Sequence, residues 1–323
     1  MDKTDNKKKV LIAAPVHKVL TEGLTAMGYE CVIDEKIDQK RAYELIGDCE
    51  GVITSTRLQL DRALLDAAPV LKWIGRMGSG MEVIDMEYAA AKGIACYGSP
   101  EGNCNAVGEH AVGMLLALIR RITWSHSEIG ANIWKRDENR GIELEGRTLG
   151  IIGFGHAGAA FAKKLQGFDM RILAYDRREI KDVPPYVEVC DLATIQREAD
   201  ILSIHVSLQP DTLNYFNDDF LAAMKKPFIL VNTSRGVVVN THTLYKGIKS
   251  GKVLGACLDV FETEPLTHAD QELRDIINEL IFSPVVIATP HIAGYTHEAL
   301  FKMSNVLLEK LSVDRKRQKA TFA

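Results

Sequence analysis

The sequence predicts an α/β protein built from two doubly wound parallel sheets, and three observations support this fold class. Short apolar runs alternate with helical patterns along almost the whole chain, which is the rhythm of repeated strand–helix–strand units. The chain has 323 residues, more than one hydrophobic core normally supports, so two domains are expected. Its apolar fraction of 46% and charged fraction of 25% are ordinary for a globular protein.

The first part of the chain contains the first strand–helix series. Candidate strands cover residues 10–14, 31–33, 51–54 and 72–75, and candidate helices cover residues 16–27, 41–46 and 61–67. Pro15 follows the first strand and Gly28 follows the first helix, and both residue types end such elements. We predict that these strands form one parallel sheet.

A second series follows a long amphipathic helix that we predict over residues 106–124. Its candidate strands cover residues 148–152, 171–175, 201–206, 228–232, 253–259 and 285–288, with helices at about 158–166 and at 299–311. We predict one domain from residues 1–100 together with 291–323, and a second domain from residues 101–290. An active site would then lie between them, where ligand sites are often found.

Charge and cysteine usage exclude several classes of partner. The net charge of −4 offers no footprint for nucleic acid or an anionic membrane. No signal peptide is visible, and the longest apolar stretch, residues 111–119, is too short to span a bilayer. The six cysteines show no C-x-x-C pair and no zinc spacing. We expect a cytoplasmic protein with reduced thiols and no metal site, membrane partner or nucleic-acid partner.

A dinucleotide-binding pattern stands between the strand at 148–152 and the next helix. The pattern G-x-G-x-x-G is formed by Gly153, Phe154, Gly155, His156, Ala157 and Gly158. The first glycine allows a tight turn, the second lets the backbone approach a pyrophosphate, and the third permits close helix–strand packing. The helix N-terminus supplies free N–H groups to the phosphates. A glycine pattern alone is weak evidence, but its place between strand and helix fits a Rossmann domain.

The next strand ends in Asp176, 18 residues after the third glycine. A carboxylate at this position accepts the ribose hydroxyls and repels a 2′-phosphate, which predicts NAD as the cofactor. Arg177 and Arg178 leave NADP open, since a guanidinium there could accommodate the extra phosphate. The alternative interpretation is a glycine turn with an ordinary surface aspartate.

Three further segments carry polar side chains at the ends of predicted strands. Arg235 lies in residues 231–240, Glu264 in residues 258–266 and His291 in residues 288–300. Open α/β sheets bind ligands at this end of their strands. Taken singly, a loop histidine is more often structural, and an Arg–Glu pair is more often a surface ion pair of little consequence.

With the glycine pattern, the segments VNTSRGVVVN, LDVFETEPL and ATPHIAGYTHEAL resemble the D-isomer-specific 2-hydroxyacid dehydrogenase family. RMGSGMEVIDMEYAAAKGI and SPEGNCNAVGEHAVGMLLALIRRI are similar to the family's first-domain signature, so the resemblance covers nearly the whole chain. It implies an NAD-dependent oxidoreductase that interconverts a D-2-hydroxy acid and its 2-oxo acid. It also implies a Rossmann NAD-binding domain beside a flavodoxin-like substrate domain.

The resemblance assigns the catalytic roles to Arg235, Glu264 and His291, and elementary chemistry agrees. Oxidation of an alcohol needs a base for the hydroxyl proton, reduction needs the same group as an acid, and histidine serves both directions. Glu264 would hold the imidazole in one tautomer and stabilise its protonated form. Arg235 offers a planar fork to a carboxylate or carbonyl oxygen.

The same resemblance implies further site residues. Asp259 would contact the nicotinamide carboxamide, and His205 and Thr233 would line the cofactor cleft. Backbone N–H groups around Ser79 and Gly80 would receive the substrate carboxylate in a glycine-rich turn.

The chain departs from the family pattern at three positions. His156 and Ala157 stand where the family usually has Arg-Ile, which removes a possible cationic contact to the phosphates. In the first domain, Glu82 replaces the usual Asp.

The substrate is predicted from smaller differences within the family. Glu264 argues against formate as the substrate. The segment SPEGN, together with the first-domain pattern, favours the D-3-phosphoglycerate dehydrogenase branch of the family, which belongs to serine biosynthesis. The chain would then be a short form without a regulatory domain. A phosphate needs another cation, for which Arg57 and Arg76 are candidates. A glyoxylate or hydroxypyruvate reductase is the alternative among enzymes. A non-enzymatic, NAD-sensing binding module like the family's corepressors is the alternative from another class.

The family resemblance also implies a homodimer. Residues 106–124 and the following loop with Trp134 provide apolar surface suited to a two-fold interface.

Overall fold

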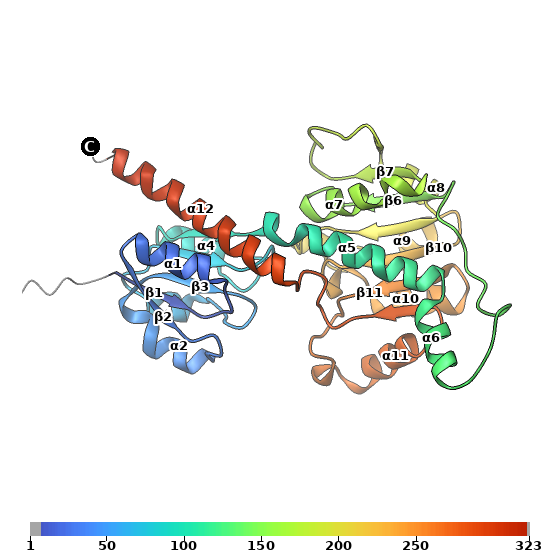
Figure 1. Ribbon diagram of the computed structural model, residues 1–323, viewed down its shortest axis with the longest axis horizontal. Coiled ribbons are helices and arrows are strands. Elements are labelled where there is room, and N and C mark those ends of the chain that lie inside the picture. Colours follow the sequence, from blue (N-terminus) through green and yellow to red (C-terminus); the bar gives the residue numbers. More distant parts are fainter. Residues whose placement is uncertain (1–7, 322–323) are drawn as a thin grey trace, which may run out of the picture. The chain divides into compact units, whose positions relative to one another are not determined.

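The structure, a computed structural model, describes residues 8–321. The described chain divides into two compact units, each with its own sheet (Figure 1). The first unit comprises the described residues up to Asn103 together with those from Tyr295 onward, and the second unit runs from Cys104 to Gly294. All strand pairs in both sheets are parallel, which confirms the predicted fold class.

The first unit contains a five-stranded sheet in the order β2-β1-β3-β4-β5, the arrangement of flavodoxin-like folds. Its strands are β1 (Lys8–Ile12), β2 (Tyr29–Ile33), β3 (Cys49–Thr54), β4 (Trp73–Arg76) and β5 (Ala95–Gly98). Its helices are α1 (Lys18–Ala26), α2 (Gln39–Leu45), α3 (Arg62–Asp66), α4 (Met86–Ala91) and α12 (His297–Thr321), with a 3₁₀ turn at Ile46–Asp48.

The central strands β1, β3 and β4 of this sheet are largely buried, which explains their apolar stretches, whereas the edge strand β2 is partly exposed. Along β1, Val10 faces one core cluster and Leu11 the other, because successive side chains of a strand point to opposite faces. Helix α12 belongs to the cluster of Val10, since Leu307 and Leu311 are buried there. The C-terminal helix is thus an integral part of the first unit.

The second unit contains a seven-stranded sheet in the order β12-β11-β10-β9-β6-β7-β8. Its strands are β6 (Thr148–Ile152), β7 (Arg171–Tyr175), β8 (Val187–Val189), β9 (Ile201–Ile204), β10 (Phe228–Asn232), β11 (Val253–Leu258) and β12 (Val286–Ala288). The order reverses between β6 and β9, and open α/β sheets bind ligands at the carboxyl ends of strands at such a switch point.

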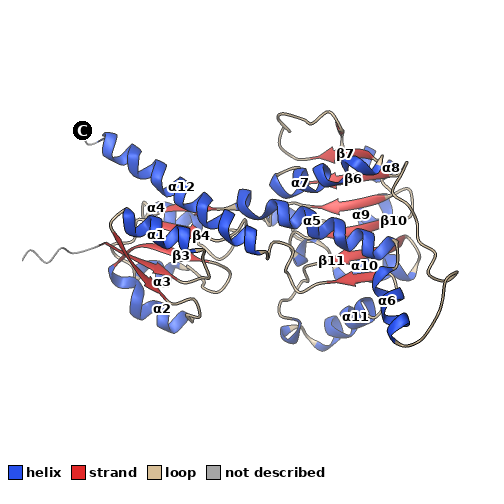
Figure 2. Cartoon of the chain, viewed as in Figure 1, coloured by secondary structure: helices blue, strands red, loops and turns tan. Residues whose placement is uncertain are grey.

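Helices pack against this sheet, and Figure 2 distinguishes them from the strands. They are α5 (Pro100–Ile119), α6 (Ile122–Gly130), α7 (His156–Leu165), α8 (Leu192–Glu198), α9 (Asp218–Ala223), α10 (Thr241–Lys249) and α11 (Gln271–Ile281). Short 3₁₀ turns cover Gln166–Phe168, Pro210–Thr212, Gly236–Val238 and Leu266–His268.

The single helix predicted over residues 106–124 is wrong. Helix α5 ends at Ile119, and Arg121 adopts a left-handed backbone with φ of 54° before α6 begins. The Arg121 guanidinium donates to Asn139 and lies over the Trp124 ring, so contacts from a distant segment accompany the break. The final helix is also longer than the predicted residues 299–311.

No helix among the described residues has the length and apolar character needed to cross a bilayer. Within the same residues, no group of three or more His, Cys, Asp or Glu side chains is arranged to hold a metal ion.

Candidate functional site

The glycine turn between β6 and α7 is shaped by close backbone packing. A Cβ atom on Gly153, whose φ is +89°, would lie 2.7 Å from the His205 carbonyl carbon. A Cβ on Gly158 would lie 2.2 Å from the Gly153 carbonyl oxygen, whereas one on Gly155 would meet nothing within 4 Å. Packing therefore requires glycine at the first and third positions, and the second leaves the backbone open to approach.

Asp176, which follows β7, is held against this turn. Its Oδ2 accepts from the Phe154 N–H at 2.9 Å, and its Oδ1 accepts from the Arg178 N–H at 3.0 Å. The Arg177 guanidinium is engaged by Asp211 at 2.5 Å. The exposed His156 is the first residue of α7, and Ala157, partly buried, follows it.

His205 and Thr233 follow the neighbouring strands β9 and β10. The His205 Nε2 lies 2.7 Å from the Ser203 Oγ, and burial lowers the pKa of this imidazole to about 4, so the ring is neutral at neutral pH. The His205 Nδ1 and the Thr233 Oγ1 are buried and have no partner among the described residues. Buried polar atoms are normally hydrogen-bonded, so these two, at the carboxyl ends of β9 and β10, fit a site completed by a polar ligand such as a dinucleotide.

His291 and Glu264 form a hydrogen-bonded pair in which Nδ1 lies 2.6 Å from Oε2. The other oxygen of Glu264 accepts from the Phe261 N–H at 2.9 Å. Burial raises the pKa of Glu264, but the hydrogen bonds from His291 and Phe261 and the charge of Arg235 outweigh this and lower the pKa below its usual value. The site therefore holds an ionised, oriented carboxylate against one ring nitrogen of the histidine.

Arg235 follows β10 and is half-buried. Asn232 organises its segment, because its side-chain oxygen accepts from the N–H and hydroxyl of Ser234 and its amide donates to the Arg235 carbonyl. The Arg235 Nη1 donates to the Ser234 carbonyl at 2.7 Å. The three residues predicted to be catalytic thus follow three adjacent strands of the second unit, with His291 and Glu264 in direct contact.

The backbone at His291 is left-handed, with φ of 56°. Such a conformation costs about 1–2 kcal/mol for a residue other than glycine, so neighbouring contacts must hold it. The Asp259 carbonyl accepts from the His291 N–H at 2.7 Å, and its carboxylate accepts from the N–H groups of Ile292 and Ala293 at 2.8 and 2.9 Å. Asp259, predicted from the sequence to contact nicotinamide, is thus the buried anchor of the His291 turn.

Sequence reasoning missed two members of this network, His110 and Thr289. The Thr289 hydroxyl donates to Asp259 at 2.6 Å, and the His110 Nε2 lies 3.0 Å from the same hydroxyl oxygen. Because the single hydroxyl proton is already engaged, His110 acts as the donor to Thr289. The place of His110 in EHAVG and of Thr289 beside the predicted histidine in ATPH was the available signal.

The remaining predicted residues lie in the first unit, at the end of β4 or in the loops that follow β3 and β4. Arg76 is the last residue of β4 and is buried, with its Nη1 donating to the Met77 carbonyl at 2.7 Å. Arg57 is exposed in the loop after β3. Ser79 is exposed and Gly80 is buried in the turn after β4.

A parallel sheet with a glycine turn at its switch point, and a carboxylate at the end of the next strand, defines a dinucleotide-binding α/β protein. Residues 112–293 match the family model described as "D-isomer specific 2-hydroxyacid dehydrogenase, NAD binding domain". The chain therefore belongs to the D-isomer specific 2-hydroxyacid dehydrogenase family, and NAD is the cofactor of its second unit.

Similar proteins match over most of this chain. A D-3-phosphoglycerate dehydrogenase of Archaeoglobus fulgidus is 32% identical over 94% of this chain, which spans 56% of the length of that relative. A hydroxypyruvate reductase of Thermotoga maritima is 34% identical over 94% of this chain and 97% of its own. A glyoxylate reductase of Thermofilum pendens is 36% identical over 92% of this chain and 89% of its own.

The fold is likewise similar to that of a solved structure. The D-lactate dehydrogenase of Aquifex aeolicus, in complex with NAD and lactic acid, superposes with a TM-score of 0.82. The two chains are 27% identical, and the match covers 96% of each.

Proposed function

We propose that this protein is an NAD-dependent dehydrogenase that interconverts a D-2-hydroxy acid and the corresponding 2-oxo acid. The observation that carries the proposal is the 2.6 Å contact between the His291 Nδ1 and the Glu264 Oε2, within the unit that matches the NAD-binding domain. An imidazole oriented by an ionised carboxylate is a proton donor and acceptor fixed in one orientation. Bound NAD would supply the hydride chemistry.

The roles of the three catalytic candidates follow from their chemistry. With Nδ1 engaged by Glu264, the Nε2 of His291 is the nitrogen that would take the hydroxyl proton during oxidation and return it during reduction. The Glu264 carboxylate would stabilise the imidazolium that forms. Arg235 would bind the substrate carboxylate or carbonyl oxygen through its planar guanidinium.

The cofactor would lie at the switch point between β6 and β9. The turn with its open position at Gly155 would receive the pyrophosphate, and Asp176 would receive the ribose hydroxyls. The residues proposed to line the cofactor are Gly153, Gly155, His156, Ala157, Gly158, Asp176, His205, Thr233 and Asp259. For Asp259 the nicotinamide contact would add to its anchoring of the His291 turn.

We propose D-3-phosphoglycerate and 3-phosphohydroxypyruvate as the substrate pair, which would place the protein in serine biosynthesis. The exposed Arg57 would bind the phosphate, with Arg76, Ser79 and Gly80 contributing to the same part of the first unit. One observation favours a smaller, unphosphorylated substrate such as hydroxypyruvate or glyoxylate. Arg76 is buried, and its guanidinium donates to the Met77 carbonyl. Of the two candidate cations for a substrate phosphate, Arg57 is therefore the more exposed one.

A substrate panel tests the proposal and separates its alternatives. NADH consumption would be followed with phosphohydroxypyruvate, hydroxypyruvate, glyoxylate and pyruvate, for the native protein and for Arg57→Ala. We expect turnover, with Arg57→Ala raising KM for the phosphorylated substrate alone. An equal effect on hydroxypyruvate would exclude phosphate binding by Arg57. Tight NADH binding with no turnover of any 2-oxo acid would instead support a non-enzymatic NAD sensor.

We also propose that the protein forms a homodimer and works in the cytoplasm. Helix α6 has no buried residue, and Ile122, Ile129, Ile133 and Trp134 are exposed on it or just after it. Such a cluster of apolar side chains is typical of a protein interface. All six cysteines are free, which fits a reducing compartment.

A further inference from the structure

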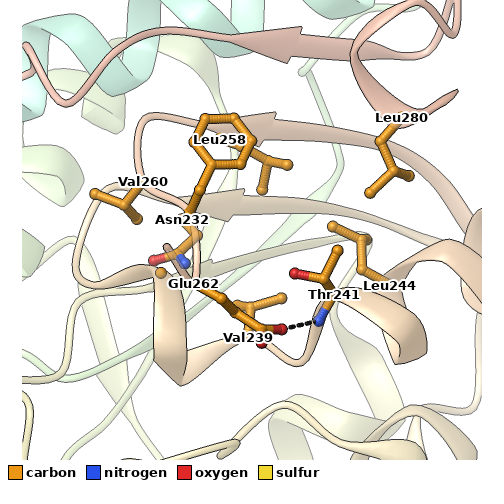
Figure 3. A pocket seen from close by; sticks show the side chains of 10 residues that line it. Asn232, Val239, Thr241, Leu244, Leu258, Val260, Glu262 and Leu280 are labelled. Atoms are coloured by element: carbon orange, nitrogen blue, oxygen red, sulfur yellow. Dashed lines mark hydrogen bonds between the residues drawn. The ribbon is translucent and has the colours of Figure 1, made fainter. Parts of the chain in front are cut away.

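The segment that carries Glu264 is fastened to the start of helix α10 by Glu262. The Glu262 Oε1 accepts a hydrogen bond from the backbone N–H of Thr241, the first residue of α10 (Figure 3). The side chain of Asn240, the N-cap of the same helix, accepts from the Thr243 N–H at 2.9 Å. The free N–H groups at this helix end are therefore shared between the helix's own cap and a carboxylate from the Glu264 segment.

The same segment touches the Arg235 segment on its other side. Gly236 directly follows Arg235, and a Cβ atom at Gly236 would lie 1.8 Å from the carbonyl carbon and oxygen of Phe261. The two backbones are thus in direct contact with no room for a side chain. The N–H of Phe261 in turn donates to the Glu264 Oε1. Residues 261–262 therefore contact Gly236, the residue next to Arg235, and the N–H of Phe261 also orients Glu264.

A small pocket lies beside this contact, and Figure 3 shows Glu262 and Thr241 joined by their hydrogen bond among the residues that line it. It is lined by Asn232, Gly236, Val239, Thr241, Leu244, Leu258, Val260, Phe261, Glu262 and Leu280. Its empty volume, open solvent included, is about 270 Å³. Most of its lining is apolar, and the polar residues Glu262 and Thr241 in it are already hydrogen-bonded to each other. The pocket therefore belongs to the framework of the site.

We propose that Glu262 is a positioning residue that holds Glu264 in register with Arg235 and His291. This inference rests on the function proposed above. Loss of the bond to Thr241 would free the 261–264 segment from α10, and the carboxylate of Glu264 would no longer be fixed against the His291 Nδ1. The Gly236 contact fixes the backbone on the Arg235 side, so Glu262 supplies the second attachment point that a rigid segment needs.

Two substitutions remove the same hydrogen bond from opposite ends. Glu262→Ala removes the acceptor. Thr241→Pro removes the donor at the first helical position, where proline is well tolerated, and Asn240 already has the extended backbone (φ −67°, ψ 118°) that precedes proline. Glu262→Gln keeps an acceptor oxygen. The exposed Glu272, in the first turn of α11, provides a matched control as Glu272→Ala.

We expect Glu262→Ala and Thr241→Pro each to lower kcat about tenfold, because a small misplacement of a catalytic group is costly, while the NADH dissociation constant stays unchanged. Glu262→Gln and Glu272→Ala should stay within about threefold of the native kcat, since one keeps an acceptor and the other lies outside the site. In a Glu264→Gln background, Glu262→Ala should cost less than about twofold more, since the group that it positions is already disabled. Thermal unfolding and NADH fluorescence titration would verify that each variant is folded.

Full kcat in Thr241→Pro, or a loss by Glu262→Ala that is undiminished in the Glu264→Gln background, would overturn the inference. If Glu262→Ala does not fold, Thr241→Pro alone decides between the two outcomes. Failure of the proposed function has a different signature. In that case the native protein would turn over none of the 2-oxo acids in the panel, or Glu264→Gln would keep the native kcat, whereas failure of the positioning role alone would leave the native protein active and Glu264→Gln impaired.

Discussion

The imidazole of His291 and the carboxylate of Glu264, 27 positions apart in the chain, are joined by a hydrogen bond of 2.6 Å. The contact arises because β11 and β12 are adjacent and parallel, so the loops that follow them emerge at the same edge of the sheet. Asp259 fixes the left-handed turn at His291 from within. The sheet therefore places both partners, and one buried carboxylate orients the turn that carries the histidine.

Replacement of His291 by alanine should remove most of the activity and leave cofactor binding intact. If its Nε2 transfers the substrate proton, kcat should fall at least ~100-fold in both directions, because general acid–base catalysis contributes about that much. NADH affinity, measured by fluorescence titration, should not change. His268→Ala, at an exposed position, is the control. A loss of only a few fold would assign proton transfer to another group.

Replacement of Glu264 by glutamine should move the pH profile of alcohol oxidation. The pKa of Glu264 is below its usual value, so the carboxylate is ionised over the whole neutral range. Its negative charge stabilises the imidazolium, which is the inactive form when the histidine must accept a proton. Without that charge the inactive protonated form loses its stabilising partner, and the acidic limb of kcat/KM should shift to lower pH. An acidic limb that stays in place would exclude this role for Glu264.

Elements buried on both sides were the ones that sequence reasoning located best. The bounds predicted for residues 148–152, 171–175 and 228–232 coincide with β6, β7 and β10, because these strands are apolar runs in the middle of the sheet. The helix break at Arg121 was missed because contacts with Asn139 and Trp124, which no local pattern reveals, accompany it. A helix pattern of the right period continues across the break.

The candidate site, like the fold, could be predicted from the sequence only in part. Residue types at strand ends predicted which side chains to consider, since chemistry and strand order are both readable in sequence. The function of Asp259 as an anchor depends on backbone N–H groups of Ile292 and Ala293, which carry no side-chain signal. The hydrogen bond between Glu262 and the Thr241 N–H likewise leaves no signal in the sequence, because any residue other than proline could supply that N–H.

Acid should destabilise the protein through His205. The unfolded histidine titrates near pH 6.5, whereas burial lowers its folded pKa to about 4. The unfolded state therefore binds more protons between these values, so stability is full above pH 6.5 and is lost as the pH falls toward 4. Between pH 7 and 5 this one group should account for about 2 kcal/mol of the unfolding free energy.

The measurement is urea unfolding of the native protein and of His205→Gln at both pH values. The variant should lose less stability on acidification, because glutamine does not titrate. His242→Gln, at an exposed position of α10, should behave like the native protein. Equal acid sensitivity of His205→Gln and the native protein would show that His205 is accessible to protons in the folded state.

The exposed apolar surface of α6 should hold two copies of the chain together. Ile129 in α6 is 53% exposed and Trp134, shortly after the end of α6, is 79% exposed, and large exposed apolar side chains are costly to leave in water. Light scattering of the native protein should give twice the chain mass of 35.8 kDa at micromolar concentration. The double variant Ile129→Asp/Trp134→Asp should give the mass of one chain, because a two-fold interface would then repeat the buried charges on both sides.

Phe282→Asp, which places the same charge at another exposed aromatic position, should leave the dimer intact. A native protein that scatters as a single chain, or a double variant that remains dimeric, would place the interface elsewhere or remove it.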